Sequence, residues 1–237
     1  MPAALAAPVE VEALVWSALL EGADEAAAGE GDIHALDGGR WLLSKTDGLH
    51  LIADGETRPL LAGRFESLDA RFGMEVDGQS LLMLSMIDAD TGQLRIALVD
   101  GAAGSIVTQR QIEMSEAVPE VQCLYQSPLT GDVSVFSVDA RGMLEQRYVY
   151  QAGANSLVDI PVRRDVGLLE AEGCAVDDST GRLYIAEGPL GIWAYEASEE
   201  TDAVRSGVLL ARPFGALTGE LEDIAIDAQG SLWVLTS

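Results

Sequence analysis

Basic residues, cysteine and long apolar runs are scarce in this chain, and each scarcity excludes a class of protein. Among the 237 residues, 14 Lys+Arg stand against 39 Asp+Glu, so the formal net charge is −25 at pH 7. A nucleic-acid-binding protein needs a basic surface to meet the phosphate backbone, so this charge excludes nucleic acid as a partner. Divalent cations, and anions that such cations bring with them, remain compatible partners.

A membrane-spanning helix needs about 20 consecutive apolar residues, and the chain has no such run. We therefore expect no membrane span. The first eight residues, Met-Pro-Ala-Ala-Leu-Ala-Ala-Pro, lack the basic start and the full apolar region of a signal peptide. The low lysine content and the strong acidity nevertheless suit a secreted or periplasmic bacterial protein.

The two cysteines, Cys123 and Cys174, are too few for a disulfide-dense scaffold or a cysteine-rich zinc site. Both lie inside apolar runs, Val-Gln-Cys-Leu and Gly-Cys-Ala-Val. Because free cysteine behaves as a small buried hydrophobe, we expect two buried thiols, with a disulfide as the alternative.

What the chain does have is a repeated pattern of an apolar strand, an Asp/Gly turn and a second apolar strand. Hydrophobic residues make up 48% of the sequence, enough to bury a core. The predicted second strands start near five positions: Trp41, Leu81, Val133, Leu183 and Leu232. The steps between them, about 40 to 50 residues, are typical of propeller blades built from four strands.

These repeats predict an all-β protein, a β-propeller of about five four-stranded blades; a truncated six-bladed propeller is the alternative. The predicted propeller covers residues 30–237, and residues 1–29 form an N-terminal strand and linker that pack on the last blade. The fifth repeat has only two strands, and a blade needs about two more to cover its edge. We therefore expect Val9–Trp16 to complete it.

Several hydrolase motifs are missing from the sequence. It has no Gly-x-Ser-x-Gly nucleophile elbow and no Gly-x-x-x-x-Gly-Lys-Ser/Thr phosphate loop. Neither cysteine is followed by the arginine that a cysteine-dependent phosphatase requires. His34 and His50 are not in an Arg-His-Gly context, which excludes histidine-phosphatase chemistry, and we expect both to be ordinary strand residues.

Carboxylates at the starts of two predicted inner strands are the remaining candidates for chemistry. Glu172 and Glu222 occupy equivalent positions in the fourth and fifth repeats, and Glu170 and Glu220 precede each by two residues. In an extended chain, residues two apart share a face. Hard oxygen ligands grouped in this way are what Ca²⁺ binds. The alternative is that these are solvated carboxylates in an acidic chain.

The stretch that begins at Glu172 also carries a resemblance. Its residues Glu-Gly-Cys-Ala-Val-Asp-Asp, then Gly-Arg-Leu-Tyr-Ile-Ala-Glu and Gly-Ile-Trp, resemble the corresponding motif of the β-propeller phytases. Lys45-Thr-Asp-Gly-Leu, Leu68-Asp-Ala-Arg and Leu221-Glu-Asp-Ile resemble three further segments of that family, in the same order. The similarity covers residues 30–237.

This resemblance implies a six-bladed propeller that hydrolyses myo-inositol hexakisphosphate (phytate) with bound Ca²⁺. Metal ions of this kind lower the pKa of bound water and neutralise charge on phosphoryl oxygens. Glu172 and Glu222 match calcium-binding glutamates, and Glu220 stands where the family has a calcium-binding aspartate. The basic residues that the resemblance offers to substrate phosphates are Lys45, Arg71 and Arg141.

Several family positions are changed here. A second phosphate-binding lysine is replaced by Thr46 and a calcium ligand by Gly188. A phosphate-binding arginine falls near Ile87, an active-site tyrosine near Gln122, and a lysine near Ala140. Losing such contacts removes electrostatic stabilisation on which phosphoryl transfer depends.

Three hypotheses follow. In the first, the segment is a degenerate auxiliary domain, the incomplete N-terminal part of a tandem-domain phytase. It would be weakly active or inactive alone, and would support a C-terminal catalytic propeller by capturing calcium-phytate or by packing against it. In the second, it is an active Ca²⁺-dependent inositol-phosphate phosphatase. In the third, it is a non-enzymatic propeller that binds protein.

Overall fold

The computed structural model describes most of the chain from Ile33 onward. The described residues are 33–36, 39–53, 55–114, 117–168, 170–188, 190–198, 206–210, 215, 217, 219–227 and 229–236. The chain divides into two units, Met1–Glu30 and Gly31–Ser237, and the description below concerns the second. The expected strand at Val9–Trp16 lies outside the described residues.

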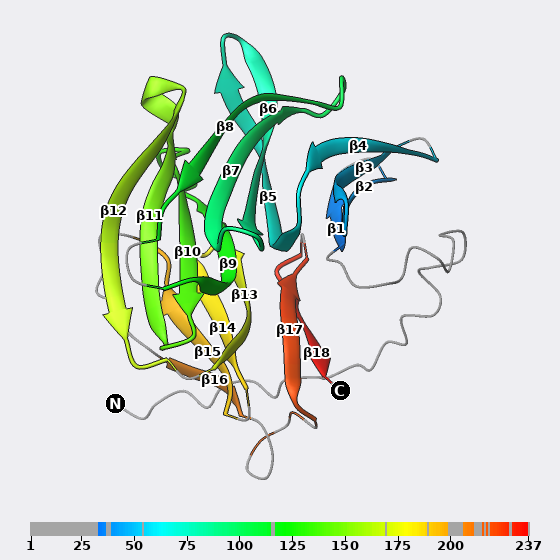
Figure 1. Ribbon diagram of the computed structural model, residues 1–237. Coiled ribbons are helices and arrows are strands. Elements are labelled where there is room, and N and C mark those ends of the chain that lie inside the picture. Colours follow the sequence, from blue (N-terminus) through cyan, green and yellow to red (C-terminus); the bar gives the residue numbers. More distant parts are fainter. Residues whose placement is uncertain are drawn as a thin grey trace. The chain divides into compact units, whose positions relative to one another are not determined.

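The second unit consists of antiparallel sheets whose strands follow one another in chain order (Figure 1). The first sheet contains β1 (Ile33–Leu36), β2 (Arg40–Lys45), β3 (Gly48–Ala53) and β4 (Glu56–Ala62). The second contains β5 (Phe65–Val76), β6 (Gln79–Asp88), β7 (Gln93–Asp100) and β8 (Ser105–Ile112). The third contains β9 (Pro119–Gln126), β10 (Val133–Asp139), β11 (Met143–Gln151) and β12 (Ser156–Val166).

The fourth sheet contains β13 (Ala171–Asp177), β14 (Arg182–Glu187), β15 (Gly191–Glu196) and β16 (Ser206–Leu210), and the fifth pairs β17 (Leu221–Ile226) with β18 (Leu232–Thr236). A short 3-10 helix, η4 (Ala152–Ala154), joins β11 to β12. No helix among the described residues is long and apolar enough to cross a membrane.

The predicted repeat is confirmed, because the second strand of every sheet starts at or within two residues of its predicted position. For example, β10 starts at Val133 and β18 at Leu232, both as predicted. The all-β propeller architecture is therefore confirmed, with five sheets in the described part of the chain and two strands in the fifth. His34 and His50 lie in strands β1 and β3, as expected.

Aspartate side chains organise many of the hairpin turns, which explains part of the chain's acidity. In each case the carboxylate accepts hydrogen bonds from backbone N–H groups two to four residues further along, as in an Asx turn. The residues that do this are Asp88, Asp100, Asp139, Asp177 and Asp227. A carboxylate in this setting closes a turn and need not bind a ligand.

The hydrophobic core lies between neighbouring sheets. One cluster joins Leu42 of the first sheet to Leu84 of the second, and another joins Met83 of the second to Val135 of the third. Two further clusters join the third sheet to the fourth and the fourth to the fifth. Apolar side chains are thus buried between each pair of sheets that follow one another in the chain, as between propeller blades.

The first strands of consecutive sheets lie side by side and run in the same direction. Ser67 of β5 hydrogen-bonds to the backbone of Gln122 in β9, and the Leu124 N–H donates to Asp69 two residues further along both strands. Between β13 and β17, a Cβ placed on Gly173 would lie 2.5 Å from Asp223 Oδ1, so only glycine allows this close approach. The starts of these first strands therefore lie at the same end of the sheets.

The expectation of two free thiols is wrong. Cys123 of β9 and Cys174 of β13 form a disulfide, with their Cα atoms 6.0 Å apart and a sequence separation of 51 positions. The physical reason is the side-by-side packing of first strands, which places equivalent repeat positions in contact. The apolar surroundings predicted burial correctly for Cys123, which is 1% exposed, but did not reveal its partner.

Candidate functional site

The predicted calcium-binding glutamates lie where two first strands begin. Glu172 is the second residue of β13 and Glu222 the second residue of β17. Glu220 lies just before β17, and the side chains of all three are exposed. The sequence therefore placed these residues correctly in the fold, at equivalent positions of neighbouring sheets.

A fifth carboxylate, Glu120, joins Glu170, Glu172, Glu220 and Glu222. The pKa of Glu172 is raised by partial burial and by the negative charges of Glu170, Glu120 and Glu220. Glu120 is the second residue of β9, so it opens the third sheet as Glu172 opens the fourth. Because Glu120 and Glu172 occupy equivalent positions of two repeats, the repeat pattern of the sequence could have identified Glu120. We call this group, Glu120, Glu170, Glu172, Glu220 and Glu222, the acidic end.

The acidic end has the donor chemistry that Ca²⁺ prefers, since carboxylate oxygens are its usual protein ligands. Within the described ranges, however, no group of three or more acidic, histidine or cysteine side chains lies close enough to hold a metal ion. The residues present do not form a preassembled calcium site.

Gly188 lies beside the acidic end, directly after β14 (Arg182–Glu187). A Cβ built on it would lie 3.7 Å from the Glu170 carbonyl oxygen and 4.0 Å from Glu172 Oε1. An acidic side chain at this position would therefore extend the carboxylate group. Its absence removes one oxygen donor from the place where the resemblance expects a calcium ligand.

Two of the three predicted phosphate contacts lie at the same end of the sheets. Lys45 ends β2, and the hydroxyl of its neighbour Ser44 donates to the carbonyl of Phe65, the first residue of β5, at 2.5 Å. Arg141 is exposed in the turn after β10, where its guanidinium lies 3.3 Å from Asp139. Their contact with phosphate stays a prediction.

Arg71, the third predicted phosphate contact, forms hydrogen bonds to other residues of the protein. All five of its N–H donors are used: Nε and Nη2 bond to Asp178, Nη1 to Asp69 and the Ala70 carbonyl, and Nη2 also to the Leu124 carbonyl. Burial lowers its pKa, but the charges of Asp69 and Asp178 outweigh this and raise it overall. A phosphate could bind Arg71 only if these hydrogen bonds were broken, so we do not include Arg71 in the proposed site.

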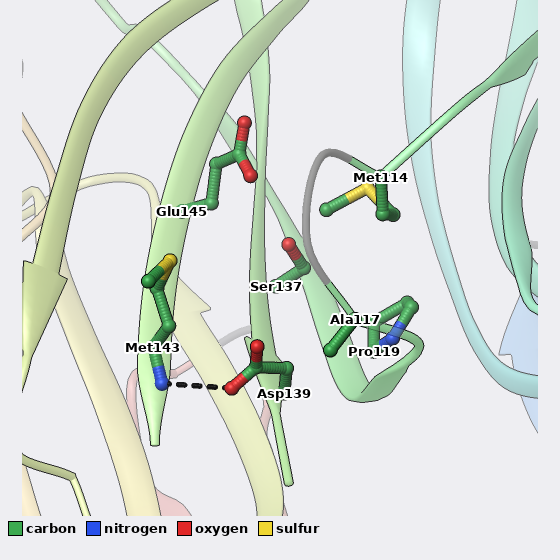
Figure 2. Close-up of a pocket in the computed structure, with 7 residues that line it drawn as sticks. All are labelled: Met114, Ala117, Pro119, Ser137, Asp139, Met143 and Glu145. Carbon is green, nitrogen blue, oxygen red and sulfur yellow. Dashed lines mark hydrogen bonds between the residues drawn. The ribbon is translucent and has the colours of Figure 1, made fainter. Parts of the chain in front are cut away.

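A small cavity opens beside the start of β9. It encloses about 10 Å³ and is lined by Met114, Ala117, Pro119, Ser137, Asp139, Met143 and Glu145. Figure 2 shows its two carboxylates and the hydrogen bond that Asp139 accepts from the Met143 backbone N–H, at 3.0 Å. The second carboxylate, Glu145, forms an ion pair with Arg147. The volume fits one water molecule and excludes an inositol phosphate.

Comparison with known proteins now decides the family. A sequence model described as Phytase matches residues 42–232. The chain belongs to the phytase family. It is 26% identical over 171 residues to a 3-phytase of Bacillus subtilis strain 168, an alignment that covers 69% of this chain and 44% of that protein. The chain thus spans less than half of the length of this curated relative.

A solved structure of a luciferin-regenerating enzyme is similar in fold, with a TM-score of 0.52 at 13% identity, over 90% of this chain and 71% of that one. At this identity the likeness concerns the fold alone. Phytase membership, in contrast, rests on the sequence match over residues 42–232.

Two positions where the resemblance expects phytase active-site residues are built into the core instead. Gln122, near the position where the resemblance expects a tyrosine, is 3% exposed. Its side-chain amide donates to the carbonyls of Ser67 and Ser85, and its oxygen accepts the Ser85 hydroxyl at 2.6 Å. Ile87, near the position where the resemblance expects an arginine, is 3% exposed in the core between the second and third sheets. Both side chains are buried within the protein.

Proposed function

We propose that this chain is a degenerate auxiliary domain of a longer phytase, which captures calcium-phytate at the acidic end and releases little or no phosphate by itself. Membership of the phytase family supports phytate as the ligand. The main support for the proposed loss of activity is the burial of Gln122. Where the resemblance expects an active-site side chain, this residue forms hydrogen bonds to the second sheet. Catalysis of phosphoryl transfer depends on positioned charge, and buried Ile87, near the position of an expected phosphate-binding arginine, supplies none.

Calcium is the proposed bridge between an acidic surface and an anionic ligand. The chain's charge of −25 repels phytate when no cation is present. A Ca²⁺ ion takes six to eight oxygen ligands, and an ion bound together with phytate would draw some of them from phosphate. Fewer protein ligands then suffice, which is compatible with the separated carboxylates of Glu172, Glu220 and Glu222.

We propose that the working partner is a C-terminal catalytic propeller domain of the same polypeptide, supplied with calcium-phytate by this domain or packed against it. The proposed location is outside the cytoplasm, secreted or periplasmic. The disulfide between Cys123 and Cys174 supports this location, because such bonds persist in oxidising compartments.

A second candidate is an active Ca²⁺-dependent inositol-phosphate phosphatase. The position of Lys45 and Arg141 at the same end of the sheets as Glu172 favours it, since both basic side chains could hold a phosphate there. Partly dephosphorylated inositols would be its better substrates, because fewer basic residues are available to neutralise charge. A propeller that only binds protein is the third candidate.

One set of measurements separates these candidates. Phosphate release from phytate and from lower inositol phosphates is assayed with the whole chain and millimolar Ca²⁺, and calcium-phytate binding is followed by calorimetry. We expect binding that requires Ca²⁺ and weakens in Glu172→Gln, with negligible release. Glu75→Gln, an exposed carboxylate at the opposite end of β5, is the matched control and should bind normally.

Clear turnover that Glu172→Gln abolishes would contradict the auxiliary role and establish the phosphatase. Absence of any Ca²⁺-dependent binding would contradict both and leave the protein-binding propeller.

A further inference from the structure

The interface between the third and fourth sheets, here called the seam, is joined covalently near the middle of β9 and β13. Cys123 of β9 follows Glu120 by three residues, and Cys174 of β13 follows Glu172 by two. The disulfide between the cysteines therefore ties together two strands that carry like charges at their starts. The charge of Glu120 is one of those that act on Glu172.

At its other end the same seam is held by hydrogen bonds. The Gln126 backbone N–H donates to Asp178 Oδ1 at 3.0 Å, and Arg71 donates to both oxygens of that carboxylate. These bonds lie beyond the end of β13, away from Glu172. The cysteines lie near the middle of both strands, between the strand starts and Asp178, and an apolar cluster that includes Val121 and Ala171 also fills this seam.

The neighbouring seams use different attachments near the acidic end. Between the second and third sheets, Gln122 bonds to Ser67 and Ser85. Between the fourth and fifth sheets, Gly173 allows direct backbone approach to Asp223. Between the third and fourth sheets, where Glu120 lies near Glu172, the disulfide forms the connection that these other contacts form elsewhere.

We propose that the Cys123–Cys174 disulfide is a redox-sensitive clamp that holds the starts of β9 and β13 together against the repulsion of their glutamates. A dithiol reductant supplies two electrons and two protons, the S–S bond breaks to give two thiols, and the dithiol closes to its own disulfide. The starts of the two strands then part while Asp178 keeps their far ends joined. The proposal concerns this seam and does not depend on phytate binding.

Hydrogen–deuterium exchange read by mass spectrometry tests this on the whole chain. The oxidised and fully reduced forms are compared, because they contain the same side chains and differ only in the bond. We expect exchange to rise about tenfold in residues 119–123 and 171–174, and to change much less in the first sheet and at Gln126. Added NaCl should reduce the rise, because it screens the repulsion.

The double variant Cys123→Ala with Cys174→Ala is the control, since it should show the faster exchange with or without reductant. Unchanged exchange on reduction would overturn the proposal. A uniform rise over all sheets would also overturn it, because that result means global unfolding and not the opening of one seam. So would two titratable thiols in the protein prepared under oxidising conditions.

Discussion

Arg71 and Asp178 form an ion pair across 107 residues of sequence, with Arg71 Nε 2.7 Å from Asp178 Oδ2. Arg71 belongs to the second sheet and Asp178 to the turn that follows β13 in the fourth, and Arg71 also bonds to the Leu124 carbonyl in the third. One guanidinium thus connects three consecutive sheets. Burial raises the pKa of Asp178 more than Arg71 lowers it, so this carboxylate depends on its partner.

Arg71→Lys should destabilise the fold even though it keeps the positive charge. A lysine ammonium cannot reproduce the fork that serves Asp178 and Leu124 together, and each lost hydrogen bond to a buried charged group costs about 1.5–3 kcal/mol. We expect the free energy of unfolding in urea to fall by roughly 3 kcal/mol.

The control for this measurement is Arg58→Lys, in an ion pair whose side chains are 50% and 69% exposed. Exposed pairs contribute little, so its stability should change by less than about 0.5 kcal/mol. An equally small effect for Arg71→Lys would show that the three-sheet connection does not stabilise the fold.

Gln122→Tyr restores the residue type that the phytase resemblance expects, and we predict that it fails to restore activity. A tyrosine in this 3% exposed position overfills the core and leaves the Ser67 carbonyl without its donor. Each effect costs about 1–3 kcal/mol. We expect a loss of roughly 3 kcal/mol in urea unfolding, with no gain in phosphate release.

Gln79→Tyr, at an exposed position that starts β6, introduces the same side chain without burial and should be nearly neutral. A Gln122→Tyr variant that is as stable as the parent and releases phosphate would contradict the proposed explanation of the lost activity.

The spacing of apolar strands and Asp/Gly turns was sufficient to predict the architecture, because each sheet repeats the same local pattern. The starts of β10 at Val133 and β18 at Leu232 followed directly from it. The separation of 51 residues between Cys123 and Cys174 equals one repeat, so it places the two cysteines at equivalent positions of neighbouring sheets. The apolar residues around them predicted only that they are buried, and not that they are bonded.

The site was less predictable than the fold. Strand starts placed Glu172 and Glu222 correctly, because equivalent repeat positions share an end of the sheets. The partners of Arg71 and Gln122 depend on how three sheets pack, and local sequence does not specify this. A basic residue in a family motif predicted a phosphate contact, whereas its five donors are used within the protein.

Asp227 should make the fifth sheet sensitive to acid. Its pKa is lowered, first by the hydrogen bond from the Trp233 indole N–H at 2.9 Å and then by backbone N–H groups including that of Ser231. A lowered folded-state pKa stabilises the protein above the unfolded value of about 3.9, and this contribution is lost as pH falls through the folded value.

Asp227→Asn removes this titration while it keeps an acceptor oxygen. We expect the parent to be more stable than the variant at neutral pH and the difference to shrink below about pH 4. Urea unfolding monitored by tryptophan fluorescence across this range measures it. A stability difference that is independent of pH would show that the carboxylate charge does not matter here.

Gly188→Asp should add the missing carboxylate to the acidic end. The position points toward Glu172, with 4.0 Å from a built Cβ to Glu172 Oε1, and its φ of +30° lies in the left-handed region that aspartate and asparagine tolerate better than most residues. Without Ca²⁺ the new charge is repelled by Glu170 and Glu172. We expect a loss of about 1 kcal/mol from the backbone and a further loss from repulsion.

Gly188→Asn is the matched control, because it has the same shape and the same backbone cost without the charge. Added Ca²⁺ stabilises a protein in proportion to its binding to the folded state, so thermal unfolding with and without millimolar Ca²⁺ measures the gain. We expect Ca²⁺ to raise the melting temperature of Gly188→Asp more than that of Gly188→Asn, with about tenfold tighter binding, equivalent to about 1.4 kcal/mol. Equal stabilisation of the two variants would mean that Glu172 does not bind calcium at this end, and the proposed capture of calcium-phytate there would have to be abandoned.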